Sequence, residues 1–155
     1  MRKFIIYLLI LNLNFLFAES FEFLLLKPSP EIEALGGYLE DGGLSFFNNP
    51  AKIEGRNLSL FYNLHFVDIK QGILGLNYAF NSENLVAFGM NYVDWGEEEI
   101  TTLSQPEGTG ENFSIKDRMI FIGYCRKIDN LKIGLGVKNV KEEIADVSAS
   151  TVLYD

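Results

Sequence analysis

The sequence comprises 155 residues, 48% of them hydrophobic and 22% charged, which is the composition of a folding chain with room for one ordinary domain. Its formal net charge of -8 argues against a nucleic-acid partner, because binding phosphates requires a dense surface of lysine and arginine. Cys125 is the single cysteine, so the chain can form no internal disulfide and offers no His/Cys cluster for a metal or a redox couple. We therefore expect neither a metal nor a cofactor.

Residues 1–18 are predicted to be a secretory signal peptide. Arg2 and Lys3 precede an apolar run from Phe4 to Phe17, and Ala18 supplies a small residue for cleavage. Leu16 stands where a second small residue is usual, so an uncleaved anchor is the alternative. No later apolar stretch approaches the roughly 20 residues that a helix needs to cross a bilayer. If the mature chain enters a membrane, it must do so as strands.

Residues 19–56 are predicted to form a compact N-terminal segment with short helices. Ser29 is a plausible N-cap for a helix over Glu31–Leu35, with Pro30 at its first position and Gly36 as its terminator. Farther along, an Asn-Pro pair at 49–50 disfavours helix and can open a turn.

From Leu58 onward the hydrophobic period is two, which predicts antiparallel strands over residues 57–155. In four segments the large residues fall on one face and the small or polar residues on the other: Leu58–Val67, Ile73–Phe80, Leu85–Tyr92 and Leu131–Lys138. The segment Met119–Cys125 is apolar on both faces, so its orientation does not follow from the pattern.

The connections alternate between short and long. Residues 81–84 and 127–130 are predicted tight turns, whereas residues 96–114 are a predicted long acidic loop. Short turns on one side and a longer loop on the other are typical of transmembrane barrels. Aromatic residues near the strand ends are expected to form interfacial girdles: Tyr78, Phe80, Tyr92, Trp95 and Tyr124. A secreted β-sandwich would show much the same alternation and stays open as the alternative.

The stretch LKPSPEIEALGGYLEDGGLSFFNNPAKI, residues 26–53, resembles the N-terminal signature of the PorV/PorQ family of bacterial outer-membrane proteins, relatives of FadL-type fatty-acid transporters. Asn49, Pro50 and Ala51 match the family's Asn-Pro-Ala motif. The similarity continues into VDWGEEEITT and into KNVKEEIADVSAS at residues 138–150. The resemblance thus covers nearly all of the mature chain.

This resemblance implies a transmembrane β-barrel with the N-terminal segment inside as a partial plug, and Asn49, Pro50 and Ala51 would shape the plug that gates passage. An ordinary Asx-Pro turn explains Asn49 and Pro50 nearly as well. The family barrel has about 14 strands and the smallest membrane barrels have about eight. The residues after the N-terminal segment suffice for five long strands and the start of a sixth at Ser150. We therefore expect a mainly β fold, an open curved sheet that is an incomplete barrel from a fragment or a truncated gene product.

Two features are candidates for a catalytic or metal site. His65 is the only histidine, and its local partners in a catalytic site would be Ser59 or Asp68. Alternation places Asp68 on the opposite face, so these local residues cannot form a catalytic triad. We therefore expect a structural histidine that faces the barrel interior. The acidic run at 97–99 lacks the spacing of a calcium loop and is expected to be solvated. We expect no catalytic residue and no enzymatic activity.

Three functions remain open. The leading one is an outer-membrane channel or carrier for hydrophobic small molecules, in contact with outer-membrane lipid. The second is a scaffold or shuttle for secretion-system proteins at the cell surface, as in PorV-like members. The third is a soluble secreted β-sandwich that binds a surface partner.

Overall fold

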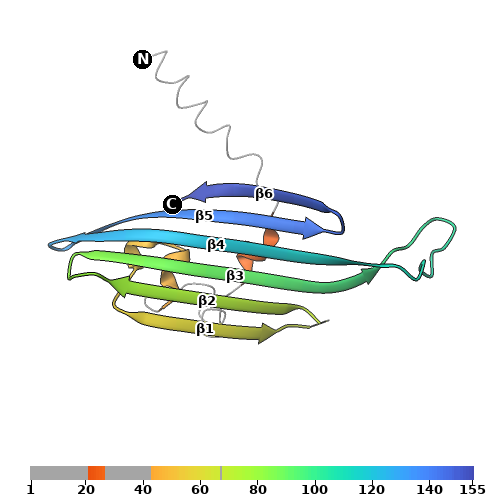
Figure 1. Ribbon diagram of the computed structural model, residues 1–155, viewed down its shortest axis with the longest axis horizontal. Coiled ribbons are helices and arrows are strands. Elements are labelled where there is room, and N and C mark those ends of the chain that lie inside the picture. The colour runs from red at the N-terminus through yellow and green to blue at the C-terminus, as the bar shows by residue number, and fades with distance from the viewer. Residues whose placement is uncertain (1–20, 27–42, 67) are drawn as a thin grey trace, which may run out of the picture.

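The computed structural model describes residues 21–26, 43–66 and 68–155, and in this part the fold is mainly β. One antiparallel sheet holds six strands in chain order, each joined to the next by a hairpin connection (Figure 1). The strands are β1 (Asn57–Leu64), β2 (Lys70–Ala79), β3 (Asn84–Glu99), β4 (Asn112–Ile128), β5 (Leu131–Ile144) and β6 (Val147–Tyr154). β1 and β6 are its two edges, so the sheet is open, as predicted. The predicted signal peptide and the predicted helix over 31–35 lie outside the described residues.

Strict alternation gives the sheet two different faces. We call the face against which the N-terminal segment packs the covered face, and the other the open face. The covered face carries these residues of the four central strands: Gln71, Ile73, Gly75, Asn77, Leu85, Ala87, Gly89, Asn91, Val93, Asp117, Met119, Phe121, Gly123, Cys125, Gly134, Gly136, Lys138 and Val140. The open face carries the large apolar residues that alternate with them, including Leu60, Leu74, Phe88, Ile122 and Leu135.

The register settles the orientation of residues 119–125, which alternation alone left open. Gly123 pairs with Gly136 on β5, and Phe121 pairs with Gly89 on β3. Met119, Phe121 and Cys125 are accordingly buried on the covered face, while Ile122 is exposed on the open face.

Helical structure in the described part of the chain consists of short 3-10 helices rather than α-helices. These are η2 (Glu22–Leu25), η3 (Ser45–Phe47) and η4 (Pro50–Lys52). All lie behind the sheet in the view of Figure 1, on one face of it. Their apolar side chains join those of the covered face in one core that includes Phe23, Phe46, Ile53, Phe121 and Val140.

Two strand boundaries differ from the sequence-based prediction. β3 continues through Glu99 and β4 begins at Asn112, so the predicted loop over 96–114 shrinks to residues 100–111. The pairing of β3 with β4 shifts register between Asp94 and Glu97 and then continues through the acidic run at 97–99. This is possible because backbone pairing needs no apolar side chains. The last strand begins at Val147 rather than at Ser150, directly after the turn at Ala145 and Asp146.

Within the described residues, no helix has both the length and the apolar character needed to span a membrane.

Candidate functional site

The Asn49-Pro50-Ala51 motif forms a capped turn pressed against β5. The side-chain oxygen of Asn49 accepts a hydrogen bond of 2.9 Å from the Ala51 nitrogen, and Pro50 occupies the first position of η4. Asparagine as N-cap followed by proline is a favoured helix start, since proline lacks the N–H that would need a partner. The residues predicted as gating candidates are therefore brought together, and Pro50 is buried.

Glycine on β5 makes this contact possible. A Cβ at Gly134 would lie 2.2 Å from the Ala51 nitrogen, and one at Gly136 would lie 2.9 Å from Pro50 Cγ. Because no side chain fits at such distances, the turn docks backbone against backbone. The thiol of Cys125 on the neighbouring strand points at the same turn, 3.7 Å from the Ala51 carbonyl oxygen.

A second pair of glycines receives the rings of η3. Gly75 and Gly89 face each other across β2 and β3. A Cβ at Gly89 would lie 2.4 Å from the Phe47 ring, and one at Gly75 would lie 2.3 Å from a methyl carbon of Leu44. The N-terminal segment thus packs on the covered face where the alternation of the strands supplies glycines.

Three phenylalanine rings anchor that segment. The ring centroid of Phe46 lies 4.5 Å from that of Phe47 and 5.1 Å from that of Phe121. Phe46 and Phe121 are completely buried. Such tilted aromatic contacts add about 0.5–1.5 kcal/mol to the free energy of burial.

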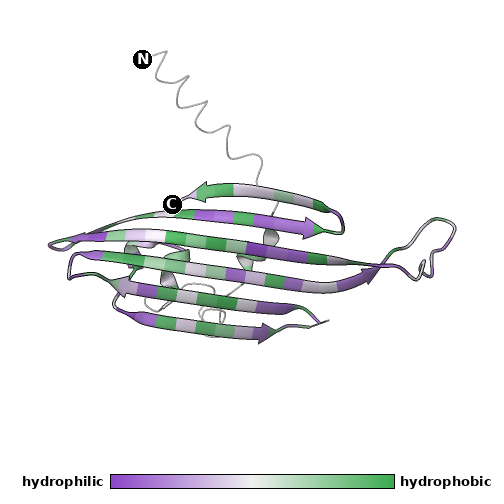
Figure 2. Ribbon diagram, in the orientation of Figure 1, coloured by the Kyte–Doolittle hydropathy of each residue, from purple (hydrophilic) through white to green (hydrophobic). Residues whose placement is uncertain are grey.

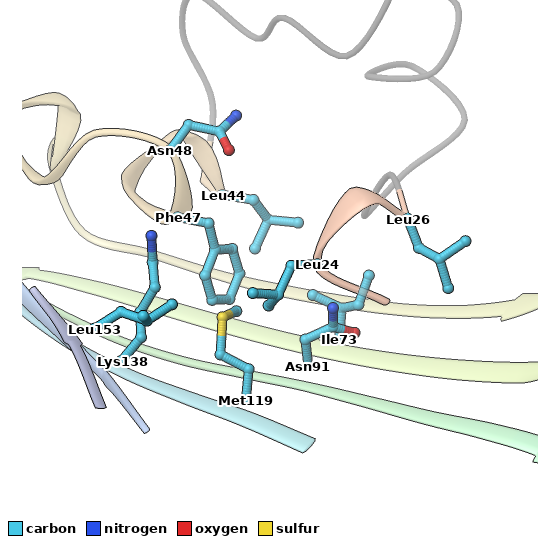
Figure 3. A pocket seen from close by; sticks show the side chains of 10 residues that line it. All are labelled: Leu24, Leu26, Leu44, Phe47, Asn48, Ile73, Asn91, Met119, Lys138 and Leu153. Atoms are coloured by element: carbon cyan, nitrogen blue, oxygen red, sulfur yellow. The ribbon is translucent and has the colours of Figure 1, made fainter. Parts of the chain in front are cut away.

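A cavity of about 130 Å³ lies beside this anchor, between the N-terminal segment and the covered face (Figure 3). Its lining is mainly apolar, and the residues that form it are Leu24, Leu26, Leu44, Phe47, Asn48, Ile73, Asn91, Met119, Lys138 and Leu153. Seven of these ten residues are apolar, and Asn48, Asn91 and Lys138 are polar or charged.

Lys138 is the charged residue in this lining. Its ammonium forms an ion pair of 2.6 Å with Asp155 and lies 6.0 Å from the Phe121 ring centroid. The pair is mostly sheltered from solvent, with 13% of the Lys138 side chain exposed. Lys138 was not singled out from the sequence, where it is one of several lysines on β5.

A chain of polar side chains crosses β1, β2 and β3 on the covered face. Gln71 is completely buried; its side-chain oxygen accepts from Asn63 at 3.1 Å and lies 3.2 Å from His65 Nε2, and its amide donates to Asn91 at 3.2 Å. These bonds satisfy groups that would otherwise be costly to bury. His65 is therefore tied to Gln71, whereas Asp68 is exposed.

Trp95 does not belong to an outward girdle as predicted. Its indole nitrogen donates a hydrogen bond of 2.5 Å to Asp117, a buried residue of the covered face. Alternation along β3 places Trp95 on the same face as Val93. The other oxygen of Asp117, Oδ1, has no hydrogen-bond partner within the described structure.

The acidic residues at 97–99 lie in β3 rather than in a loop. Glu99 accepts a hydrogen bond of 2.9 Å from the Gly110 nitrogen, and Glu97 accepts one of 3.4 Å from Asn112. Both carboxylates therefore brace the hairpin that joins β3 to β4.

The open face is apolar over its middle, and charged residues of β3, β4 and β5 follow toward the end that carries the long loop (Figure 2). At the other end Ile128, Leu131 and Ile133 are also exposed. Leu60 is 75% exposed, Ile122 63% and Leu135 66%. These residues belong to three successive rows of cross-strand partners on the open face, and we call the three rows together the apolar band. In order along the sheet the rows are Leu60, Leu74, Met90, Ile120 and Val152; Leu58, Leu76, Phe88, Ile122, Val137 and Tyr154; and Tyr78, Val86, Tyr124 and Leu135. Asn139 is a polar exception in this band.

No family model matches the chain, and neither a curated protein nor a solved structure is significantly similar to it. The resemblance to the PorV/PorQ family, and the function it implies, thus stay predictions.

Proposed function

We propose that the chain is part of an outer-membrane β-barrel, with the open face against lipid and the covered face toward the barrel interior. The observation that carries this proposal is the apolar surface of the open face. Large apolar side chains are exposed on this face across all six strands, although the opposite face already buries an apolar core together with the N-terminal segment. A soluble antiparallel sheet with one face on its core commonly has a polar opposite face in water.

Energetics support lipid as the medium of the open face. Leaving a leucine or phenylalanine in water forgoes about 1.5–3 kcal/mol of burial free energy, and contiguous apolar patches of this extent mark interaction or membrane surfaces. A β-sandwich, the alternative, would cover this face with a second sheet. The apolar hydrocarbon of a bilayer meets the same need.

On β4 the length of the apolar stretch of the open face fits a bilayer. On β4 the open-face positions 118 and 126 are both arginine. They are eight residues apart, or about 26 Å along a strand at roughly 3.3 Å per residue. At the usual strand tilt of about 40°, this spans about 20 Å along the membrane normal, close to the roughly 25 Å apolar band of such barrels. Long arginine side chains reach the remaining distance to the polar interface.

The aromatic residues support the same placement. Tyr92 pairs with Arg118 at one end of the apolar band, and Tyr78 and Tyr124 lie toward the other end. The Tyr124 hydroxyl donates a hydrogen bond of 2.5 Å to Asn84. Amphipathic rings at both borders are what interfacial girdles require.

Within this barrel we propose a channel or carrier for hydrophobic small molecules. The cavity between the N-terminal segment and the covered face supports this role, because seven of its ten lining residues are apolar. Its mechanism would be binding and diffusion, with Asn49, Pro50 and Ala51 shaping the segment that narrows the passage. No covalent chemistry is needed.

Membrane fractionation of the full-length protein tests the barrel. We expect it in the outer-membrane fraction, with a band that shifts on a gel after heating; recovery as a soluble periplasmic protein would contradict the proposal. Uptake of a labelled fatty acid by cells lacking the gene tests transport. Reduced uptake supports a channel or carrier, whereas unchanged uptake together with loss of a secreted surface protein would favour the secretion scaffold.

A further inference from the structure

The cavity between the N-terminal segment and the covered face is small. Its volume is about 130 Å³, whereas pockets that hold drug-sized ligands have about 300–1,000 Å³. An engineered apolar cavity of about 150 Å³ in another protein binds benzene. The occupant that fits is therefore a single ring or a compound of similar size, and not a long acyl chain.

The lining of the cavity favours an aromatic ring. Ile73, Asn91 and Met119 are cross-strand partners in one row of the covered face and belong to its floor, while Leu24 and Phe47 belong to its roof. In Figure 3 the Met119 sulfur points toward the Phe47 ring. Rings and thioethers both make favourable contacts with a further aromatic ring.

Asn91 gives the cavity a hydrogen-bond donor, although only 6% of this residue is exposed. Its side-chain oxygen accepts a hydrogen bond from Gln71, whose own oxygen is used by Asn63. These bonds fix the orientation of the Asn91 amide, and Figure 3 shows its nitrogen pointing away from the sheet. No hydrogen bond between described residues uses this nitrogen. A ligand with an acceptor oxygen would satisfy it.

The charge in the lining is neutralised within the chain. The Lys138 ammonium forms an ion pair of 2.6 Å with Asp155. An anionic ligand would have to compete with Asp155 for this ammonium, and a cationic ligand would be repelled by it. Asn48, the remaining polar residue of the lining, is exposed to solvent. The cavity therefore favours a neutral ligand whose polar atom lies at Asn91.

We infer that this cavity binds a small neutral aromatic compound with one acceptor oxygen, such as a phenol. Its ring lies against Phe47 and Met119, and its oxygen accepts a hydrogen bond from the Asn91 amide. This inference rests on the proposed role as a channel or carrier, because it names the class of molecule that the role would serve. A long-chain fatty acid does not fit the cavity.

Methyl NMR of the full-length protein in neutral detergent, with isotope-labelled methionine, tests this inference. Met119 lines the cavity, and Met90 lies in the apolar band on the opposite face of the sheet. Added phenol should shift the Met119 signal until the site is saturated. The Met90 signal should move only in proportion to the phenol that dissolves in the detergent. Toluene, which has the same size and no oxygen, is the reference compound.

Asn91→Leu removes the donor and should weaken the binding of phenol by about twofold to twelvefold, as expected for one neutral hydrogen bond, without weakening that of toluene. This substitution also leaves the Gln71 amide without its acceptor. Leu24→Phe is therefore the second variant, because it fills the cavity and removes no side-chain hydrogen bond. It should abolish the saturable shift for both compounds. Leu60→Phe on the open face is the matched control and should bind both as the wild type does.

Four results would overturn the inference. The Met119 signal responds to neither compound, or Asn91→Leu weakens phenol and toluene equally. Benzoate binds more tightly than phenol, which would indicate a site for an anion, or a long-chain fatty acid displaces phenol. The heat-induced gel shift is measured as a separate readout. If the wild type lacks the shift and is soluble, the barrel proposal fails; if the shift is present and the Met119 signal does not respond, only the cavity site fails.

Discussion

Replacing Gly134 with alanine should lift the Asn49-Pro50-Ala51 turn off the sheet. The new Cβ would lie 2.2 Å from the Ala51 nitrogen and 2.3 Å from the Pro50 carbonyl carbon. Both are backbone atoms, so no side-chain rotation relieves the clash, and overpacking of this kind costs about 1–3 kcal/mol. The docked state of the turn should lose that much stability relative to the undocked state.

Cys125 reports this opening directly. Its thiol is completely buried and points at the Ala51 carbonyl, 3.7 Å away. When labelling requires opening of the turn, a loss of 1–3 kcal/mol raises the native-state labelling rate by roughly fivefold to 150-fold. The assay is the rate of maleimide attachment to the folded protein in detergent, measured by mass spectrometry.

Gly72→Ala is the matched control. Gly72 also lies in a strand, and a Cβ there would meet nothing within 4 Å. This substitution should leave the labelling rate unchanged and raise stability slightly, because alanine in a strand loses less backbone freedom on folding than glycine. Equal labelling rates for the Gly134 variant and the wild type would refute the docking of the turn on β5.

Three further substitutions test other parts of the structure. Phe46→Ala removes a fully buried ring between Phe47 and Phe121 and should lower the free energy of unfolding by about 3–5 kcal/mol in a denaturant titration; a loss under 1 kcal/mol would mean that the ring is not anchored. Gln71→Leu leaves the Asn91 oxygen without its donor and should cost about 1–3 kcal/mol in the same titration, whereas a neutral result would contradict the polar chain. Ile122→Arg should make the free energy of insertion into vesicles less favourable by about 2–4 kcal/mol, while Leu103→Arg in the exposed loop should leave it unchanged. Equal insertion of the two variants would count against a lipid-facing band.

Much of the sheet could be predicted because one rule governs it. Period-two alternation identified the strands and separated large residues from small ones, and the structure confirms both the antiparallel sheet and its open edges. The rule failed where its signal was absent or was not followed. The polar run at 97–99 extends β3 without any apolar alternation, and the residue type of Trp95 predicts an interfacial position that its parity along β3 does not support.

The candidate site could be predicted only in its local part. Asn49 followed by Pro50 predicts a turn from two adjacent residues, and the structure confirms that turn. The surface that receives it could not be foreseen, because Gly134 lies far along the chain and its glycine reads as an ordinary small residue. The polar chain through Gln71 was missed for a similar reason, although a glutamine and an asparagine at covered-face positions were a signal that could have revealed it.

The central claim is that the open face contacts lipid, and accessibility of spin labels in bilayers tests it most directly. Single labels are placed at Leu60, Ile122 and Leu135 of the full-length protein in vesicles, with Leu103 in the loop as the aqueous reference. Our account predicts that dissolved oxygen relaxes the open-face labels more strongly than a water-soluble nickel complex does, and that the order reverses at Leu103. Two results would contradict it. One is that neither reagent reaches the open-face labels, as in a packed sandwich. The other is that the nickel complex reaches them as readily as it reaches the label at Leu103.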